Sequence, residues 1–455
     1  MKQQSERLGT DPIPKLLMNL AVPATVGMLV MALHSVIDAI YISRGIGTVG
    51  VAAVAIAFPV NMIFMAISGA IGIGGGSVIS RALGSNDLEK ANRAFGNIIS
   101  LVLAVSIGGA FIGLTYLIPM LDLFGASVTI MPYACDYLGI ILYGTIFFAF
   151  SFAVNNIVRA EGNARVAMLT MIMSAMLNII FTPIFMFAFN MGIRGAAYGT
   201  VLAQGITAVY LFLYFFTGKS TLSIRVNCLI PRPTLIKEIL AVGASAFIRQ
   251  GSASVMLIIA NNLLIIYGGD LAIAVLGIIH RIMMFTLMPI LGIVQGMLPL
   301  VGFNHGAKQK SRVNELIVLA MKISTALALC AFLLVIAVPR QLMMIFTTDP
   351  AAIEMGQSAL RIMFALSVTV GMQMVTGGVF QALGKARAAF AISLARQVLF
   401  LIPLLILLPQ FFDLMGIWLA FPLADLFSFI LALWLIRRHR DYFFSNSQKL
   451  QAASI

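Results

Sequence analysis

Residues 16–42 read LLMNLAVPATVGMLVMALHSVIDAIYI, and this stretch decides the fold class. It contains a single carboxylate, Asp38, and no Lys or Arg. A helix needs about 20 mostly apolar residues to cross the hydrocarbon core of a bilayer, so the stretch is long enough to span one. It is also too long for the apolar part of a signal peptide. We therefore predict that it is the first transmembrane helix.

Further stretches of the same kind follow along the chain. They lack the continuous alternation of apolar and polar residues that is typical of the strands of a membrane β-barrel. A helical bundle is then the architecture that satisfies the backbone hydrogen bonds in lipid. We predict an all-α integral membrane protein with twelve transmembrane helices. The expected spans are residues 16–42, 52–77, 95–118, 131–155, 164–188, 195–217, 237–264, 271–302, 314–338, 355–382, 388–411 and 415–436.

The composition of the whole chain agrees with this prediction. Of the 455 residues, 61% are apolar and 10% are charged, and the mean hydropathy is +1.03. Soluble globular domains are roughly 45–50% apolar and about 25% charged. A soluble enzyme and a disordered scaffold are therefore both excluded.

The net charge of +13 would suggest a nucleic-acid partner in a soluble protein. Here most basic residues fall in alternate loops between the expected spans, as the positive-inside rule requires. We therefore expect both termini in the cytoplasm, the lipid bilayer as the surrounding partner, and no binding of nucleic acid.

Short motifs repeat between the two halves of the sequence. LAVP at residues 20–23 returns as LAVG at 240–243, and GNAR at 162–165 returns as GKAR at 384–387. The offset covers six spans, an even number, so both halves must insert in the same orientation. We predict two parallel six-helix lobes around a central cleft. The expected domains are an N-lobe at 1–218, a cytoplasmic linker at 219–236, a C-lobe at 237–437 and a cytoplasmic tail at 438–455.

Asp38 is the clearest candidate for a functional residue. An ionisable group at membrane depth costs about 2.5–3.5 kcal/mol on the insertion scale and needs a reason to be there. No basic residue lies one turn away to form a simple ion pair, although His34 is four residues earlier. Asp38 is either a titratable carboxylate that exchanges a proton or attracts a cation, or a packing residue satisfied by its neighbours; we favour the former.

Asn178 and Thr182 stand four residues apart on one helix face, directly before Pro183. The missing amide of proline frees a backbone carbonyl and bends a helix, so we expect bends at Pro183 and at Pro23. The two polar residues either line a pocket or act as polar contacts between helices.

In the second half, Asp425 and Arg396 could form an ion pair, for which we favour a structural role over a role in transport. Arg249 and Arg281 are further basic residues inside expected spans. The four His residues are widely separated and no catalytic motif is present, so we expect neither an enzyme nor a dedicated metal site.

Several motifs together identify a family. They are Asp38 in the first span, RAEGNAR at residues 159–165, NIIFTP at 178–183, GAA at 195–197 and QALG at 381–384. With twelve spans in two halves, the chain resembles the multidrug and toxic compound extrusion (MATE) transporters over residues 16–437, and within them the DinF/MepA-like branch.

This resemblance implies a multidrug efflux antiporter of the bacterial inner membrane. It would export lipophilic, mainly cationic compounds in exchange for inward protons or sodium, by alternating access and without a cofactor. We expect small-molecule drugs or toxic metabolites as its ligands, and a monomer as the working form.

The resemblance also assigns roles to residues of the first half. Asp38 stands at the family's coupling carboxylate, and Asn178 matches a polar residue of its N-lobe cation site. Thr182 stands where the family often has Asp, so one carboxylate is missing. This favours the proton as the coupling ion, although oxygen atoms of Asp38, Asn178 and Thr182 could also surround sodium.

A lipid-linked oligosaccharide flippase is the alternative function within the same superfamily. Such proteins tend to hold a pyrophosphate group with several basic residues in a central cavity. Arg249, Arg281 and Arg396 are the candidates for that set.

Overall fold

The computed structural model describes residues 7–218, 220–439 and 443. Helices make up nearly all of this described part, which contains no strand and divides into two compact units. The first unit contains Val26–Gly243 together with residues 7 and 8, and the second contains Gly9–Thr25 and the described residues from Ala244 onward. Most of the expected cytoplasmic tail and Lys219 of the expected linker lie outside the described residues.

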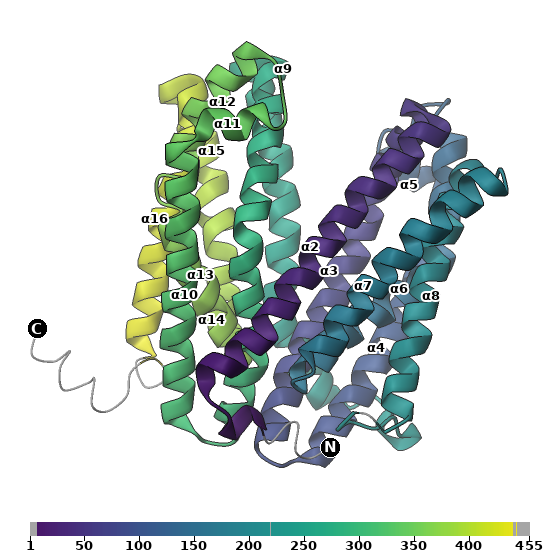
Figure 1. Cartoon of the computed structure of the whole chain (residues 1–455), viewed down its shortest axis with the longest axis vertical. Coiled ribbons are helices and arrows are strands. Elements are labelled where there is room, and N and C mark those ends of the chain that lie inside the picture. The colour runs from purple at the N-terminus through teal and green to yellow at the C-terminus, as the bar shows by residue number, and fades with distance from the viewer. Residues whose placement is uncertain (1–6, 219, 440–442, 444–455) are drawn as a thin grey trace, which may run out of the picture. The chain divides into compact units, whose positions relative to one another are not determined.

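The first unit consists of long apolar helices joined by short turns (Figure 1). Asp87 caps the start of one helix by accepting a hydrogen bond from the Lys90 amide, and Asn163 caps another by accepting from Val166. The helices are α2 (Ile13–Ile46, from Val26 onward), α3 (Thr48–Gly84), α4 (Leu88–Thr115), α5 (Leu117–Leu123), α6 (Met131–Ala160), α7 (Ala164–Pro183), η1 (Ile184–Ala188) and α8 (Gly192–Phe216).

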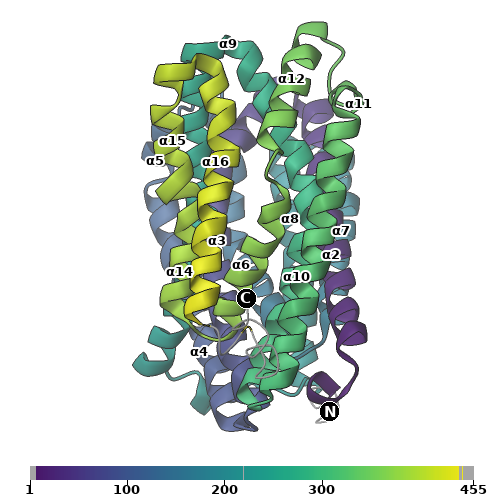
Figure 2. The same cartoon turned by 90° about the vertical axis from the view of Figure 1, so that its left-hand side faces the viewer.

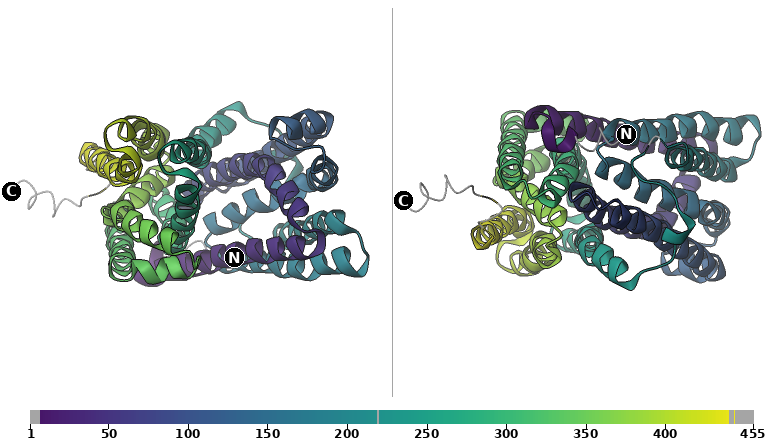
Figure 3. Two further views of the ribbon diagram at one scale, coloured as in Figure 1. Left: turned by 90° about the horizontal axis from the view of Figure 1, so that it is seen from above. Right: turned by 90° about the horizontal axis from the view of Figure 1, so that it is seen from below.

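The second unit contains the other helices, of which α14, η3 and α15 follow one another alongside α16 (Figure 2). Seen along their axes, the helices of each unit form a bundle (Figure 3). The elements are α9 (Pro233–Gly306, from Ala244 onward), α10 (Lys310–Ala337), α11 (Pro339–Met344), α12 (Pro350–Met363), α13 (Val368–Ala382), α14 (Ala386–Leu394), η3 (Ala395–Leu401), α15 (Ile402–Leu407) and α16 (Pro409–Arg438).

The twelve predicted spans are confirmed. In the described part of the chain, ten helices are long and apolar enough to cross a membrane. One of them, α9, is two spans that meet at Gly269, whose φ of 66° interrupts the helix. The pair α12 and α13, bent by 55°, makes the remaining span.

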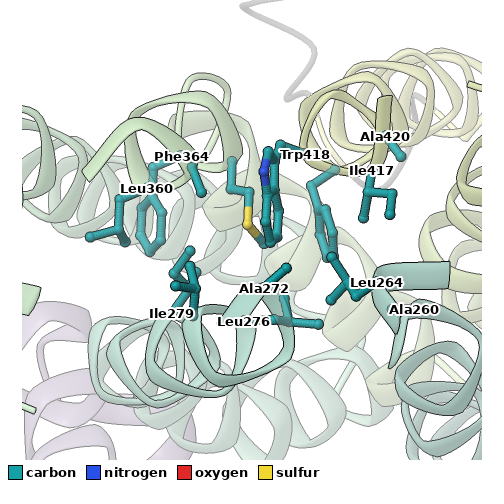
Figure 4. Packing of buried hydrophobic residues seen from close by; sticks show 14 of the residues in the cluster. Ala260, Leu264, Ala272, Leu276, Ile279, Leu360, Phe364, Ile417, Trp418 and Ala420 are labelled. Atoms are coloured by element: carbon teal, nitrogen blue, oxygen red, sulfur yellow. The ribbon is translucent and has the colours of Figure 1, made fainter. Parts of the chain in front are cut away.

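The apolar core of the second unit surrounds Trp418 of α16. Figure 4 shows its indole among side chains of α9, such as Ala272 and Leu276, and near Phe364 at the end of α12. All four residues are buried. Leu264, of the first span of α9, belongs to the same cluster. The packing therefore joins both spans of α9 to the last helix and gives the second unit a continuous core.

The beginning of α2 packs within the second unit, against the second span of α9. A Cβ atom at Gly292 would lie 1.8 Å from Thr25 Oγ1, and one at Gly296 would lie 2.6 Å from the Ala21 nitrogen. Two glycines four residues apart let helix backbones approach closely in a membrane. Pro23 lies inside this stretch of α2, two residues before the point where the helix passes to the first unit.

The described residues of the expected linker are fastened to the first unit. The Asn97 side chain donates to the Cys228 oxygen at 3.2 Å and accepts from the Arg232 amide at 2.6 Å. The Glu161 carboxylate accepts from Ser220 Oγ at 2.6 Å and from the Thr221 amide at 3.1 Å. These hydrogen bonds therefore hold the described part of the linker in a defined path along the first unit.

Candidate functional site

Asp38 lies in the part of α2 that belongs to the first unit, and its side chain is half-buried. It interacts with the side chains of His34 and Thr182. Its Oδ1 atom is enclosed, yet has no hydrogen-bond partner among the described residues. A carboxylate that must stay charged inside a protein is normally paired or receives several hydrogen bonds. The surroundings of Asp38 therefore suit a carboxylate that binds and releases a proton or a cation.

Asn178 and Thr182 lie together on α7, next to Thr200 of α8. The Thr182 hydroxyl donates to Asn178 Oδ1 at 3.1 Å, and Asn178 Nδ2 donates to Thr200 Oγ1 at 2.8 Å. The Asn178 and Thr182 side chains are buried. The structure thus brings Asp38, Thr182 and Asn178 into one polar cluster in the first unit.

Two residues of this cluster were not singled out in the sequence. Thr200 is the hydrogen-bond acceptor for Asn178, and the buried Tyr137 of α6 lies within electrostatic range of Asp38. The signal for Thr200 is its neighbour Gly199, where a Cβ would lie 2.8 Å from the Thr182 nitrogen. A glycine beside a hydroxyl residue marks the place where α8 approaches α7. A tyrosine inside a span gives no comparable signal, because it packs in helical bundles for many reasons.

Pro183 ends α7, and the chain continues in η1, a π-helical turn. Proline provides no amide to the helix, and π-turns inside helices occur frequently at functional sites. The irregular backbone therefore begins two residues after Thr182, beside the polar cluster.

The cluster offers oxygen atoms to a cation but contains one carboxylate. Among the described residues, no group of three or more His, Cys, Asp or Glu side chains could hold a metal ion. Asn178 Oδ1 already accepts the Thr182 hydroxyl. A proton needs only the Asp38 carboxylate, whereas sodium would also need these amide and hydroxyl oxygens to turn toward it.

In the second unit, Arg396 of η3 and Asp425 of α16 lie in contact. Arg396 Nε is 2.6 Å from Asp425 Oδ1, and the Asp425 side chain is 3% exposed. The backbone oxygen of Asp425 accepts from Gln373 Nε2 at 2.9 Å. The pair connects three elements, as a structural ion pair would.

A cavity of about 110 Å³ lies beside this pair in the second unit. Arg249 of α9 and Arg396 both line it, whereas Arg281 is exposed and does not line it. The three arginines considered for a flippase therefore do not share this cavity.

The comparisons with known proteins agree with this picture of the chain. The family model described as MatE matches residues 23–184 and 246–407, at a spacing that corresponds to the repeated motifs. "Multidrug export protein MepA" of Staphylococcus haemolyticus (strain JCSC1435) is 28% identical over 430 residues, 94% of each chain. The same-named protein of Staphylococcus aureus (strain N315) is 27% identical over 439 residues, 95% of each.

Solved structures resemble the chain along its length. The MATE multidrug transporter DinF-BH, in a complex with the dye rhodamine 6G, is 49% identical, with coverage of 98% of this chain and 100% of that one and a TM-score of 0.90. An outward-facing multidrug resistance MATE family transporter of the MOP superfamily is 26% identical, with coverage of 96% and 97% and a TM-score of 0.89.

Proposed function

Since the chain belongs to the MATE family of transporters, we propose that it exports lipophilic, mainly cationic compounds across the cytoplasmic membrane in exchange for inward protons. The relatives named as multidrug export proteins, and the structure solved with rhodamine 6G, support export of drugs rather than an enzymatic reaction. We further propose that the protein works as a monomer with both termini in the cytoplasm.

The observation that carries the coupling proposal is the environment of Asp38. One oxygen of its carboxylate is enclosed and has no donor among the described residues, so a proton or a cation can bind there. Export can then alternate with protonation: the neutral carboxyl returns after drug release, and the charged one attracts the next cation. Asn178, Thr182 and Thr200 hold the neighbouring helices in register around it.

Sodium is the second candidate for the coupling ion. The oxygen atoms of Asp38, Asn178 and Thr182 support it, because hard cations bind carboxylate, amide and hydroxyl oxygens. Because Thr182 provides no second carboxylate, we rank the proton ahead of sodium as the coupling ion.

The test is efflux of rhodamine 6G from proteoliposomes under an imposed proton or sodium gradient. We expect the proton gradient to drive export by the native chain, and Asp38→Asn to abolish it with the yield of folded protein unchanged. Asp122→Asn, at an exposed position of α5, is the matched control and should export normally. Export driven by sodium alone would change the ion, and no export under either gradient would refute the proposal.

A further inference from the structure

The cavity of the second unit has an unusual balance of charge. Its lining comes from α9, α13, α14 and η3, and among the described residues only Arg249 and Arg396 bring a charge to it. No carboxylate of the described chain contributes to the wall. The amides of Gln295, Gln373, Gln381 and Gln397 provide most of the remaining polar groups.

The two arginines differ in how their charge is compensated. Arg396 is paired with Asp425 at 2.6 Å, so this pair adds no net charge. Arg249 is half-buried and forms no hydrogen bond or ion pair with any other described residue. Charged groups at membrane depth are normally paired, because an unpaired charge there is costly. The wall therefore presents one positive charge that lacks a counter-charge within the described part of the chain.

Of the amides beside Arg249, that of Gln397 leaves hydrogen-bonding capacity unused. Gln373 Nε2 is occupied by the Asp425 backbone oxygen, and Gln381 Nε2 donates to Ser245 Oγ at 3.0 Å. Gln397, next to Arg396 in η3, has a buried Oε1 without a partner among the described residues. Rotation of this amide by half a turn presents its two N–H donors instead. An arginine and an adaptable amide are both suited to carboxylate oxygens.

The size of the cavity limits what it can hold. Sites for drug-sized ligands measure about 300–1,000 Å³, and one water takes up about 30 Å³ of liquid. At about 110 Å³, this cavity is smaller than such sites and has room for a carboxylate with a few attached atoms. Leu291, Val294 and Met374 provide an apolar wall for those atoms.

We propose that this cavity is a subsite for the carboxylate of amphipathic substrates, with Arg249 as the counter-charge. This rests on the proposed export function and assigns the residue that recognises the carboxylate of those substrates that carry one. Asp38 would then serve ion coupling and the attraction of cationic groups, whereas Arg249 would bind the carboxylate.

A pair of dyes tests the proposal directly. Rhodamine 6G is an ethyl ester, and its free acid has the same ring system with a carboxylate in place of the ester. Binding of each dye to the purified full-length protein is measured by fluorescence polarisation. We expect Arg249→Gln to weaken binding of the free acid at least about tenfold, since the charge that pairs with its carboxylate is removed. Binding of rhodamine 6G should change less than about twofold.

Two further variants make the result specific. Arg249→Lys keeps the charge and should restore most of the affinity for the free acid. Arg361→Gln removes the same charge from an exposed position of α12 in the second unit and should leave both dyes unaffected.

Equal loss for the two dyes, or no loss for the free acid, would overturn the subsite. Absence of free-acid binding to the native chain would do so as well. Export of rhodamine 6G in proteoliposomes is a separate readout. If the native chain binds both dyes as expected but exports neither, the export function fails while the carboxylate subsite stands.

Discussion

Arg396 Nε and Asp425 Oδ1 lie 2.6 Å apart, and Gln373 donates to the backbone of the same aspartate. Because the Asp425 side chain is 3% exposed and that of Arg396 is 27% exposed, the carboxylate depends on this partner more than the guanidinium does. These two interactions join η3 and α13 to α16, the last helix of the second unit.

Arg396→Gln should therefore destabilise the protein by about 3–5 kcal/mol, since it leaves a buried carboxylate without a counter-charge. The measurement is the apparent melting temperature in detergent. The double variant Arg396→Gln/Asp425→Asn should recover most of the loss. If it is as unstable as the single variant, the pair is not what stabilises this region.

The hydroxyl of Thr182 gives a second prediction. Thr182→Val keeps the shape but leaves the buried Asn178 Oδ1 without its donor, at a cost of about 1–3 kcal/mol. Proton-driven export of rhodamine 6G should fall as well, because the hydroxyl also faces Asp38. Thr182→Ser, which retains the hydroxyl, is the matched control. Normal export by the valine variant would remove Thr182 from the coupling site.

Glu161 predicts how stability depends on pH. This residue follows α6, outside the span, and burial raises its pKa from 4.5 to about 7, although Ser220, Tyr214 and the Thr221 amide donate to it. The folded state therefore binds the proton more tightly than the unfolded state. The stabilisation is complete below pH 4.5 and is lost as the pH rises through 7.

Melting temperatures at pH 5.5 and pH 8 measure this effect. The native protein should be less stable at the higher pH, by at most roughly 3 kcal/mol from this group. Glu161→Gln should reduce the difference, whereas Glu354→Gln, at an exposed position of α12, should not. An undiminished difference in Glu161→Gln would assign the pH dependence to another group.

Two glycines of α4 give an internally controlled comparison. A Cβ at Gly96 would lie 2.2 Å from the Cys228 oxygen, where the linker passes, whereas no described atom lies within 4 Å of one at Gly108. Gly96→Ala should destabilise the protein by about 1–3 kcal/mol through overpacking. Gly108→Ala should be neutral or stabilise it by up to about 1 kcal/mol through helix propensity. Equal melting temperatures for the two variants would contradict the close approach.

The sequence predicted the spans because length and hydropathy are required of any helix in lipid. It did not predict the helix ends. Residues 52–77 were expected as the second span, but α3 runs from Thr48 to Gly84, because a helix can extend beyond the bilayer without a change in hydropathy. In contrast, the break expected between the spans at 237–264 and 271–302 is confirmed, because the backbone angle at Gly269 interrupts α9 there.

The candidate site was predictable in part for a similar reason. Asp38, Asn178 and Thr182 attract attention because a carboxylate, or a polar pair before proline, needs an explanation inside a membrane. Thr200 attracts less attention despite its neighbour Gly199, since a lone hydroxyl can bond to its own helix, as Thr200 does with the Ala196 oxygen at 3.0 Å. The pair of Arg396 with Asp425 could be anticipated from the sequence, and the structure shows it. The lack of a partner at Arg249 among the described residues was not expected, because it depends on three-dimensional packing.

The assignment of Gly9–Thr25 to the second unit has a consequence for dissecting the protein. The chain passes between the units three times, after Leu8, after Thr25 and after Gly243, so the two halves of the sequence are interleaved rather than consecutive. A fragment that begins after the linker lacks the helical segment that packs on Gly292 and Gly296. Cleavage of the linker therefore does not yield two self-sufficient pieces: the C-terminal fragment needs the N-terminal one in the same membrane to complete its own fold.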